Sequence, residues 1–144
     1  LRTEKDRLAV IKGLQDGTID AIASDHTPQD QDAKRLPFNQ AEYGAVGLET
    51  LLPLTLNLVN NNLMKLEKAF ALITSNPSKI MRLQSGNITK GADADIIIFD
   101  VKKPWKINPE KFYSKSKNTP FDGMLVEGKN LITFIRGRLV YKDI

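Results

Sequence analysis

The apolar residues of this chain change their spacing between Gly86 and Gly91, and this change limits the folds that the chain can adopt. Before it, apolar residues recur at the spacing of one helix face. Helical spacing covers residues 3–16, 46–59 and 66–73, and a fourth, short stretch that begins at residue 76. After it, strand patterns cover residues 94–100 and a hairpin within residues 131–141. We therefore expect an α/β part over residues 1–87 and a small β-rich module over residues 88–144.

Local signals mark where several of these elements begin, end or turn. Thr3 can cap the first helix and Gly17 can end it. Pro53 lies inside the helical pattern of residues 46–59, where a proline indicates a kink or an early-turn position. The hairpin is expected to turn near Arg136 and Gly137.

Residues 18–24 are short, partly β-branched and mostly apolar, which is typical of a buried strand in a parallel sheet. Asp25 follows at the end of this expected strand, and residues 26–44 form a long polar stretch predicted to be a loop without its own secondary structure. A strand that ends in an Asp before a long loop and a helix is the arrangement on which barrel enzymes mount catalytic groups. The alternative is that Asp25 is an ordinary cap or turn residue.

Composition excludes several kinds of site. The chain has no cysteine and one histidine, so a disulfide scaffold, a cysteine nucleophile and a self-contained histidine metal site are all excluded within these residues. With 41% hydrophobic and 26% charged residues and no long apolar run, the chain is expected to be soluble, without a membrane or nucleic-acid partner. The lysines between Lys102 and Lys117 then form a solvated face. Because the chain begins at Leu1 without a signal-peptide pattern, we expect an internal fragment or trimmed product in the cytoplasm.

Other polar residues near Asp25 have two interpretations each. His26 could be a metal ligand or a general base, but a single histidine after an Asp is more often packed and hydrogen-bonded. Lys34, Arg35 and Lys79 could each hold a substrate carboxylate, although such side chains usually face water.

Several motifs resemble class I dihydroorotases. Ser24-Asp25-His26-Thr27-Pro28 and the run from Tyr43 to Thr50 resemble the last barrel strand, mobile loop and following helix of that family. Further matches to its C-terminal part cover residues 76–80, 90–95, 118–123 and 136–141. Residues 90–95 and the final hairpin also recur in hydantoinases and allantoinases, so the Asp-His-Thr-Pro loop joined to Gly-Leu-Glu-Thr is the narrower signal. The resemblance implies the C-terminal part of a (β/α)8 amidohydrolase barrel over residues 1–87, followed by part of a composite β-sandwich over residues 88–144.

The resemblance also implies a reaction, namely the reversible, zinc-dependent cyclisation of N-carbamoyl-L-aspartate to dihydroorotate in pyrimidine biosynthesis. One or two zinc ions would be held by histidines and a carboxylated lysine on earlier strands outside this chain. Asp25 would complete the metal site and carry the proton between the attacking hydroxide and the ring nitrogen. Gln29, Tyr43 and Gly44 would contact the substrate. Many members of the family have a histidine where this chain has Gln29.

Three hypotheses follow. The chain is part of an active dihydroorotase and is inactive alone, or it is a non-catalytic dihydroorotase-like subunit that supports aspartate carbamoyltransferase, or it is part of another cyclic amidohydrolase such as a hydantoinase. We also expect the isolated chain to form a homo-oligomer, because Leu48, Leu52 and Leu56 would be exposed.

Overall fold

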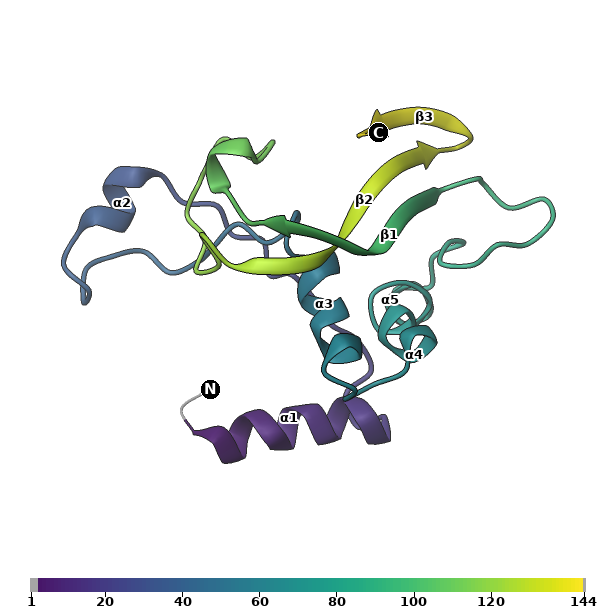
Figure 1. Cartoon of the computed structure of the whole chain (residues 1–144), viewed down its shortest axis with the longest axis horizontal. Coiled ribbons are helices and arrows are strands. Elements are labelled where there is room, and N and C mark those ends of the chain that lie inside the picture. The colour runs from purple at the N-terminus through teal and green to yellow at the C-terminus, as the bar shows by residue number, and fades with distance from the viewer. Residues whose placement is uncertain (1–2, 144) are drawn as a thin grey trace.

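The computed structural model describes residues 3–143 and places a three-stranded sheet above a group of helices (Figure 1). The helices are α1 (Glu4–Asp16), α2 (Gln31–Arg35), α3 (Leu51–Asn60), α4 (Leu66–Ala71) and α5 (Ser75–Ile80). The strands are β1 (Ile96–Lys106), β2 (Leu125–Ile135) and β3 (Arg138–Lys142), with a short 3-10 helix at Pro109–Lys111 between β1 and β2. In the described part of the chain, no helix is long and apolar enough to cross a membrane.

The first helix forms as its sequence predicts. Thr3 and Asp6 make a reciprocal capping box, and Gly17 ends the helix in a left-handed conformation at φ 88°. Leu14, on the inner face, packs in a core with Met64, Ala69 and Leu72. This core joins α1 to α4 and is the first of two.

Helix α3 is shorter than predicted, because it begins at Leu51 and not at residue 46. The backbone N–H of Val46 donates to the carbonyl of Asn118 at 2.9 Å, so residues 44–47 pair with other segments before the helix starts. Pro53 lies in the first turn of α3, where its missing N–H removes no helical hydrogen bond. The predictions of the short helices α4 and α5 are confirmed.

The sheet is antiparallel in the order β1-β2-β3. The predicted hairpin is confirmed, since Ile135 pairs with Arg138 and the two residues between them have positive φ angles of 49° and 75°. Two positive φ angles are the geometry of a type I′ turn, which matches the twist of the paired strands. Both β1 and β2 extend beyond the residues predicted for them.

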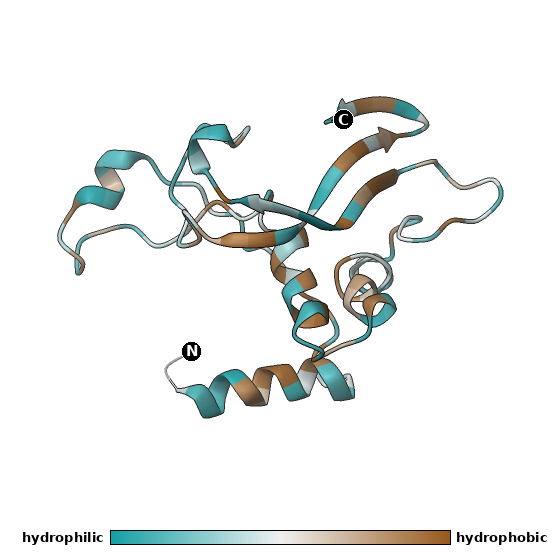
Figure 2. Cartoon of the chain, in the orientation of Figure 1, coloured by the Kyte–Doolittle hydropathy of each residue, from teal (hydrophilic) through white to brown (hydrophobic). Residues whose placement is uncertain are grey.

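A second core joins the helical part to the sheet. Val46 packs with Ile107, Phe112 and Val126, and Trp105 and Phe121 pack around them. Figure 2 shows hydrophobic stretches on α3 and on the strands above it. The prediction that Leu56 is exposed is wrong: only 1% of it is exposed, because its methyl group occupies the space beside Gly128 of β2. Leu48, by contrast, is 65% exposed as expected, and Leu52 is half-buried.

Two further predictions differ from the structure. Residues 18–24 form no strand among the described residues, since a parallel strand requires a hydrogen-bonded neighbour. The pairing nearest to this segment is a single parallel bridge between His26 and Ala45. The loop over residues 26–44 does contain a helix, because the Asp30 side chain accepts a hydrogen bond from the N–H of Ala33 and caps α2. With five residues, α2 is too short to be recognised from periodicity.

Candidate functional site

Asp25 has an exposed side chain and a left-handed backbone conformation at φ 46°. Asp is one of the few residues other than glycine that adopt this conformation readily. Its backbone carbonyl accepts a hydrogen bond from the Thr27 hydroxyl at 3.1 Å. Within residues 3–143 its carboxylate has no hydrogen-bond or ion-pair partner, so both carboxylate oxygens can meet a ligand.

Two glycines allow the segment around Asp25 to lie against the segment that precedes α3. A Cβ atom on Gly47 would lie 2.6 Å from the carbonyl oxygen of Ser24, and one on Gly44 would lie 2.5 Å from the carbonyl oxygen of Thr27. Real Cβ atoms do not approach backbone oxygens so closely, so neither position has room for a side chain. The two glycines therefore bracket Asp25 and His26 from the facing segment.

His26 is half-buried and hydrogen-bonded. Its Nδ1 atom accepts a hydrogen bond from the backbone N–H of Gly47 at 3.1 Å, which places the proton of the neutral ring on Nε2. The Nδ1 lone pair is therefore engaged and cannot bind a metal ion. This geometry favours the packed, hydrogen-bonded interpretation of His26.

The residues predicted to bind substrate meet where the loop of residues 27–45 leaves and rejoins the body of the protein. The backbone N–H of Thr27 donates to Ala45 at 2.9 Å, and the side-chain amide of Gln29 donates to the carbonyl of Tyr43 at 3.0 Å. Tyr43 itself is 90% exposed. The structure thus brings Tyr43 and Gly44, from the returning end of the loop, together with Gln29, which follows Asp25 by four residues.

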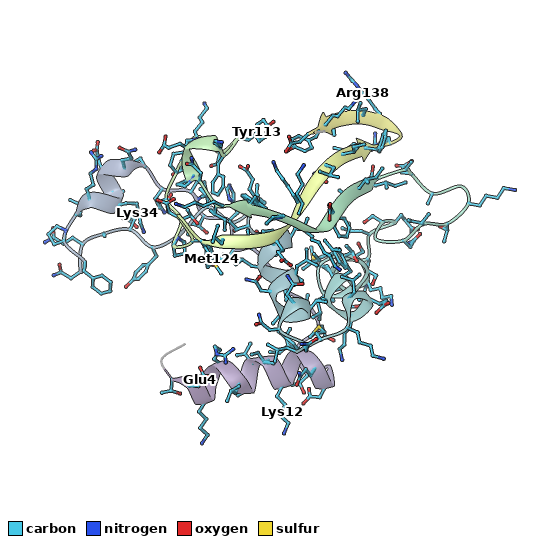
Figure 3. All side chains as sticks on the ribbon, viewed as in Figure 1. Glu4, Lys12, Lys34, Tyr113, Met124 and Arg138 are labelled. Atoms are coloured by element: carbon cyan, nitrogen blue, oxygen red, sulfur yellow. The ribbon has the colours of Figure 1, made fainter. Side chains whose placement is uncertain are left out.

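The candidate cations near the loop differ in their surroundings. The ammonium group of Lys34, labelled in Figure 3, donates to the carbonyls of Glu42 at 2.7 Å and Gly44 at 3.2 Å. Lys34 therefore braces the loop from inside. Arg35 and Lys79 are exposed, as the water-facing interpretation predicts.

Sequence reasoning gave no role to two residues of the β-rich module that contact this loop. The side-chain oxygen of Asn118 accepts hydrogen bonds from the backbone N–H of Gln29 at 3.3 Å and the Ser116 hydroxyl at 2.8 Å. Its amide nitrogen donates to the carbonyl of Gly44 at 2.9 Å. The Ser116 hydroxyl also lies against the carbonyl of Gln29, and its single proton can be donated either to this carbonyl or to the Asn118 oxygen. The only signal in the sequence was that Asn118 begins the matched motif of residues 118–123.

Glu49 also connects the start of α3 to the β-rich module. One of its carboxylate oxygens accepts a hydrogen bond from the backbone N–H of Tyr113 at 2.8 Å. Glu49 belongs to the Gly-Leu-Glu-Thr stretch of residues 47–50. Together with Ser116 and Asn118, this bond means that the segment between the 3-10 helix and β2 holds the loop and the start of α3. The β-rich module is therefore a structural neighbour of the candidate site.

An apolar hollow of about 270 Å³ lies between the segment that precedes Asp25 and helix α3. Its lining includes Ile22, Val46, Leu54 and Phe121, and Asp25 is not part of it. A hollow of this composition suits packing against other apolar residues and provides no group for acid-base chemistry.

The described residues include no group of three or more His, Cys, Asp or Glu side chains that could hold a metal ion. Asp25 fits one position in a metal site, because it is an exposed carboxylate with both oxygens free. His26 does not add a second ligand through Nδ1. Any further ligands would have to come from residues outside this chain.

Shifted pKa values occur on the sheet. A hydrogen bond and the charge of Lys129 lower the pKa of the Asp143 carboxyl, and the two groups form an ion pair at 2.5 Å. Burial raises the pKa of the Tyr141 hydroxyl, with a smaller contribution from Asp143. The ring of Tyr141 meets that of Tyr113, labelled in Figure 3, edge to face. These shifts concern the stability of the sheet.

Comparison with known proteins gives a consistent result. Residues 1–140 match the model of the amidohydrolase family. The chain is 51% identical over 142 residues to a dihydroorotase of Anaplasma phagocytophilum and 45% identical over 143 residues to one of a Wolbachia of Drosophila simulans. Each alignment covers 99% of this chain and 32% of the relative, so the chain spans about a third of the length of these curated relatives. The solved L-hydantoinase of Arthrobacter aurescens superposes with a TM-score of 0.91 and 33% identity, over 97% of this chain and 32% of that chain.

Proposed function

Because the chain belongs to the amidohydrolase family, we propose that it forms the C-terminal third of a dihydroorotase. Eight relatives named dihydroorotase share 41–51% identity with it, whereas the solved L-hydantoinase of Arthrobacter aurescens shares 33%. The substrate pair would be N-carbamoyl-L-aspartate and dihydroorotate. The single observation that carries the proposal is the exposed carboxylate of Asp25, which has no partner among residues 3–143 and belongs to a segment packed against Gly44 and Gly47. This segment lies in a motif that resembles this family.

The chemistry assigned to Asp25 requires a carboxylate. One oxygen of its side chain can bind a cation while the other accepts and returns a proton, so binding and proton transfer occur at one place. In ring opening, Asp25 would take the proton from the attacking nucleophile and deliver it to the departing ring nitrogen, and ring closure would reverse these steps. Both oxygens are free for this work in the structure.

Zinc is the metal that we propose, with one or two ions and with Asp25 as one ligand. A bound zinc ion would supply a nucleophile near neutral pH by lowering the pKa of water. The ligand set available here is incomplete, because the described residues include no group of three or more His, Cys, Asp or Glu side chains and Nδ1 of His26 is engaged by Gly47.

Gln29, Tyr43 and Gly44 are proposed to contact the substrate. The carbonyls of Tyr43 and Gly44 accept hydrogen bonds from Gln29, Asn118 and Lys34. Their backbone N–H groups have no acceptor among residues 3–143, so they can donate to the carbonyl or carboxylate oxygens of the substrate. Gln29 can donate a second hydrogen bond from its amide nitrogen but provides no positive charge.

We also propose the division into a barrel segment over residues 1–87 and part of a β-sandwich over residues 88–144. Two separate cores support it, one among the helices and one around the sheet. Val46, in the second core, and Leu56, which packs beside Gly128, would connect the two parts. The exposed Leu48 supports the proposal that this surface is covered, either by other residues of the same protein or in a homo-oligomer.

The proposal can be tested by measuring dihydroorotate ring opening by the complete gene product with zinc supplied. The variant Asp25→Asn keeps the size of the side chain and removes its charge, so turnover should fall by at least about a hundredfold, the lower range for general acid-base catalysis. Asp32→Asn, an exposed carboxylate in α2 of the same loop, serves as the matched control and should leave turnover unchanged.

Each other outcome would point to one of the alternatives. Turnover of hydantoin but not of dihydroorotate would identify another cyclic amidohydrolase. No turnover of either substrate would favour a non-catalytic subunit, and co-purification with aspartate carbamoyltransferase would then be the next measurement. Equal activity of Asp25→Asn and the unmodified protein would contradict the role of Asp25.

A further inference from the structure

We propose that Asn118, with Ser116, is a positioning residue that holds the substrate-contacting loop closed at its base. The proposal rests on the proposed function, because it concerns the same loop. We call these two residues the Asn118 clamp. Both lie in the β-rich module: Ser116 is 87 positions and Asn118 is 89 positions from the loop residue Gln29.

The clamp contacts both ends of the loop with one side chain. The oxygen of the Asn118 amide holds the N–H of Gln29 on the outgoing side, and its nitrogen holds the carbonyl of Gly44 on the returning side. The Ser116 hydroxyl lies between the carbonyl of Gln29 and the oxygen of Asn118 and can donate its one proton to either of them. A single planar amide therefore sets the separation of the two sides where Gln29 and Gly44 lie.

Besides the clamp, the described residues hold the loop through the backbone pair of Thr27 with Ala45, the bond from Gln29 to Tyr43 and the bonds from Lys34 to the carbonyls of Glu42 and Gly44. These bonds join residues of the loop to one another, whereas the clamp joins the loop to the β-rich module. Tyr43, Phe38 and Leu36 are 90%, 98% and 47% exposed, so side-chain packing contributes little to the order of the loop. Without the clamp, the loop would sample more open conformations, and fewer of them would present the N–H of Gly44 correctly.

The side chain of Asn118 can be removed without removing the connection between the two parts. The backbone carbonyl of Asn118 accepts the hydrogen bond from Val46, and any residue at position 118 can do the same. The core around Val46 and Ile107 does not include the Asn118 side chain. A substitution at position 118 therefore acts on the loop and leaves the core in place.

The test compares Asn118→Ala and Asn118→Asp with Asn60→Ala in the complete gene product. Asn118→Asp keeps the acceptor oxygen and the shape but loses the donor to Gly44, so it remains informative if the alanine variant folds poorly. Asn60 is the matched control, because its amide also connects the helical part to β2, through a bond to Glu127 at 3.1 Å, but does not touch the loop.

We expect both Asn118 variants to raise KM for dihydroorotate about tenfold or more, while kcat changes by less than about threefold. The reason is that a disordered loop weakens substrate binding without moving Asp25. Asn60→Ala should leave both constants unchanged. A fall in kcat with KM unchanged would indicate a general loss of folded enzyme and would overturn the proposal, as would a KM within about twofold of the unmodified protein for both variants.

A second readout does not depend on activity. Trypsin can cut after Arg35, which is exposed in α2 of the loop. Cleavage at this bond should be faster in both Asn118 variants than in Asn60→Ala, and equal cleavage rates would overturn the proposal. If the unmodified protein does not open dihydroorotate, the proposed function fails, and the cleavage rates alone then decide whether Asn118 orders the loop.

Discussion

Replacing Gly47 by alanine tests whether close backbone contact positions Asp25. The added Cβ atom would lie 2.6 Å from the carbonyl oxygen of Ser24 and 3.2 Å from its Cβ atom. Ordinary contact begins at 3.4 Å, so the two segments must separate by about 0.8 Å. The backbone N–H of Gly47 also donates to His26, so the same movement stretches that 3.1 Å bond.

This displacement sets the size of the expected losses of stability and of turnover. Overpacking of this kind destabilises a protein by about 1–3 kcal/mol. A displacement approaching 1 Å at a catalytic group can reduce turnover by about a hundredfold. Gly47→Ala should therefore lower the free energy of unfolding, measured in urea titrations, by about 1–3 kcal/mol. It should also lower dihydroorotate turnover by roughly ten- to a hundredfold.

Gly91→Ala is the matched control. Unlike Gly47, Gly91 has a positive φ angle, of 89°, but no atom lies within 4 Å of an added Cβ. Alanine there should lower stability by about 1 kcal/mol through backbone strain and leave turnover unchanged. If Gly47→Ala retains full turnover and unfolds like the unmodified protein, the close approach of residues 24 and 47 does not position Asp25, and the reasoning is refuted.

Two predictions concern stability alone. Leu56→Ala should lower the free energy of unfolding by about 2–5 kcal/mol without changing the urea m-value, because it empties the space between α3 and Gly128. Leu125→Ala, which truncates a leucine that is 77% exposed at the start of β2, is its control and should change stability little, whereas equal losses in the two would contradict the packing of Leu56. The lowered pKa of Asp143 stabilises the fold above its ordinary pKa, and this stabilisation is lost as the pH falls below about 4. In acid titrations of unfolding, Asp143→Asn should remove that loss, and an unchanged profile would show that the ion pair with Lys129 contributes nothing.

Local elements could be predicted from the sequence because their determinants lie close together in the chain. The capping box of Thr3 and Asp6 and the left-handed Gly17 define α1 from within or beside the helix. The turn at Arg136 and Gly137 likewise depends on two adjacent residues. The identity of Asp25 as the candidate catalytic group also came from its place after residues 18–24 and before a long loop.

Contacts between distant residues decided the rest. The pattern of residues 18–24 predicts a strand, but these residues, all of which the structure describes, form none. A strand needs a hydrogen-bonded neighbour, and the pattern of the stretch itself does not show whether one is present. Leu48 and Leu56 look alike in the sequence, and only Gly128 of β2 determines that Leu56 is the buried one. Asn118 lies 74 positions from Gly44 and has no local signal of its contact with the loop.

The sequence by itself therefore determined the type of residue at the candidate site and the ends of the local elements. These depend on backbone conformation and on hydrogen bonds over a few residues. Only the tertiary structure decided that Asp25 is exposed, that His26 is engaged by Gly47 and that Asn118 bridges the base of the loop. The exposure of Asp25 depends on which segments pack around it. The bonds of His26 and Asn118 depend on which distant backbone groups come within hydrogen-bond distance.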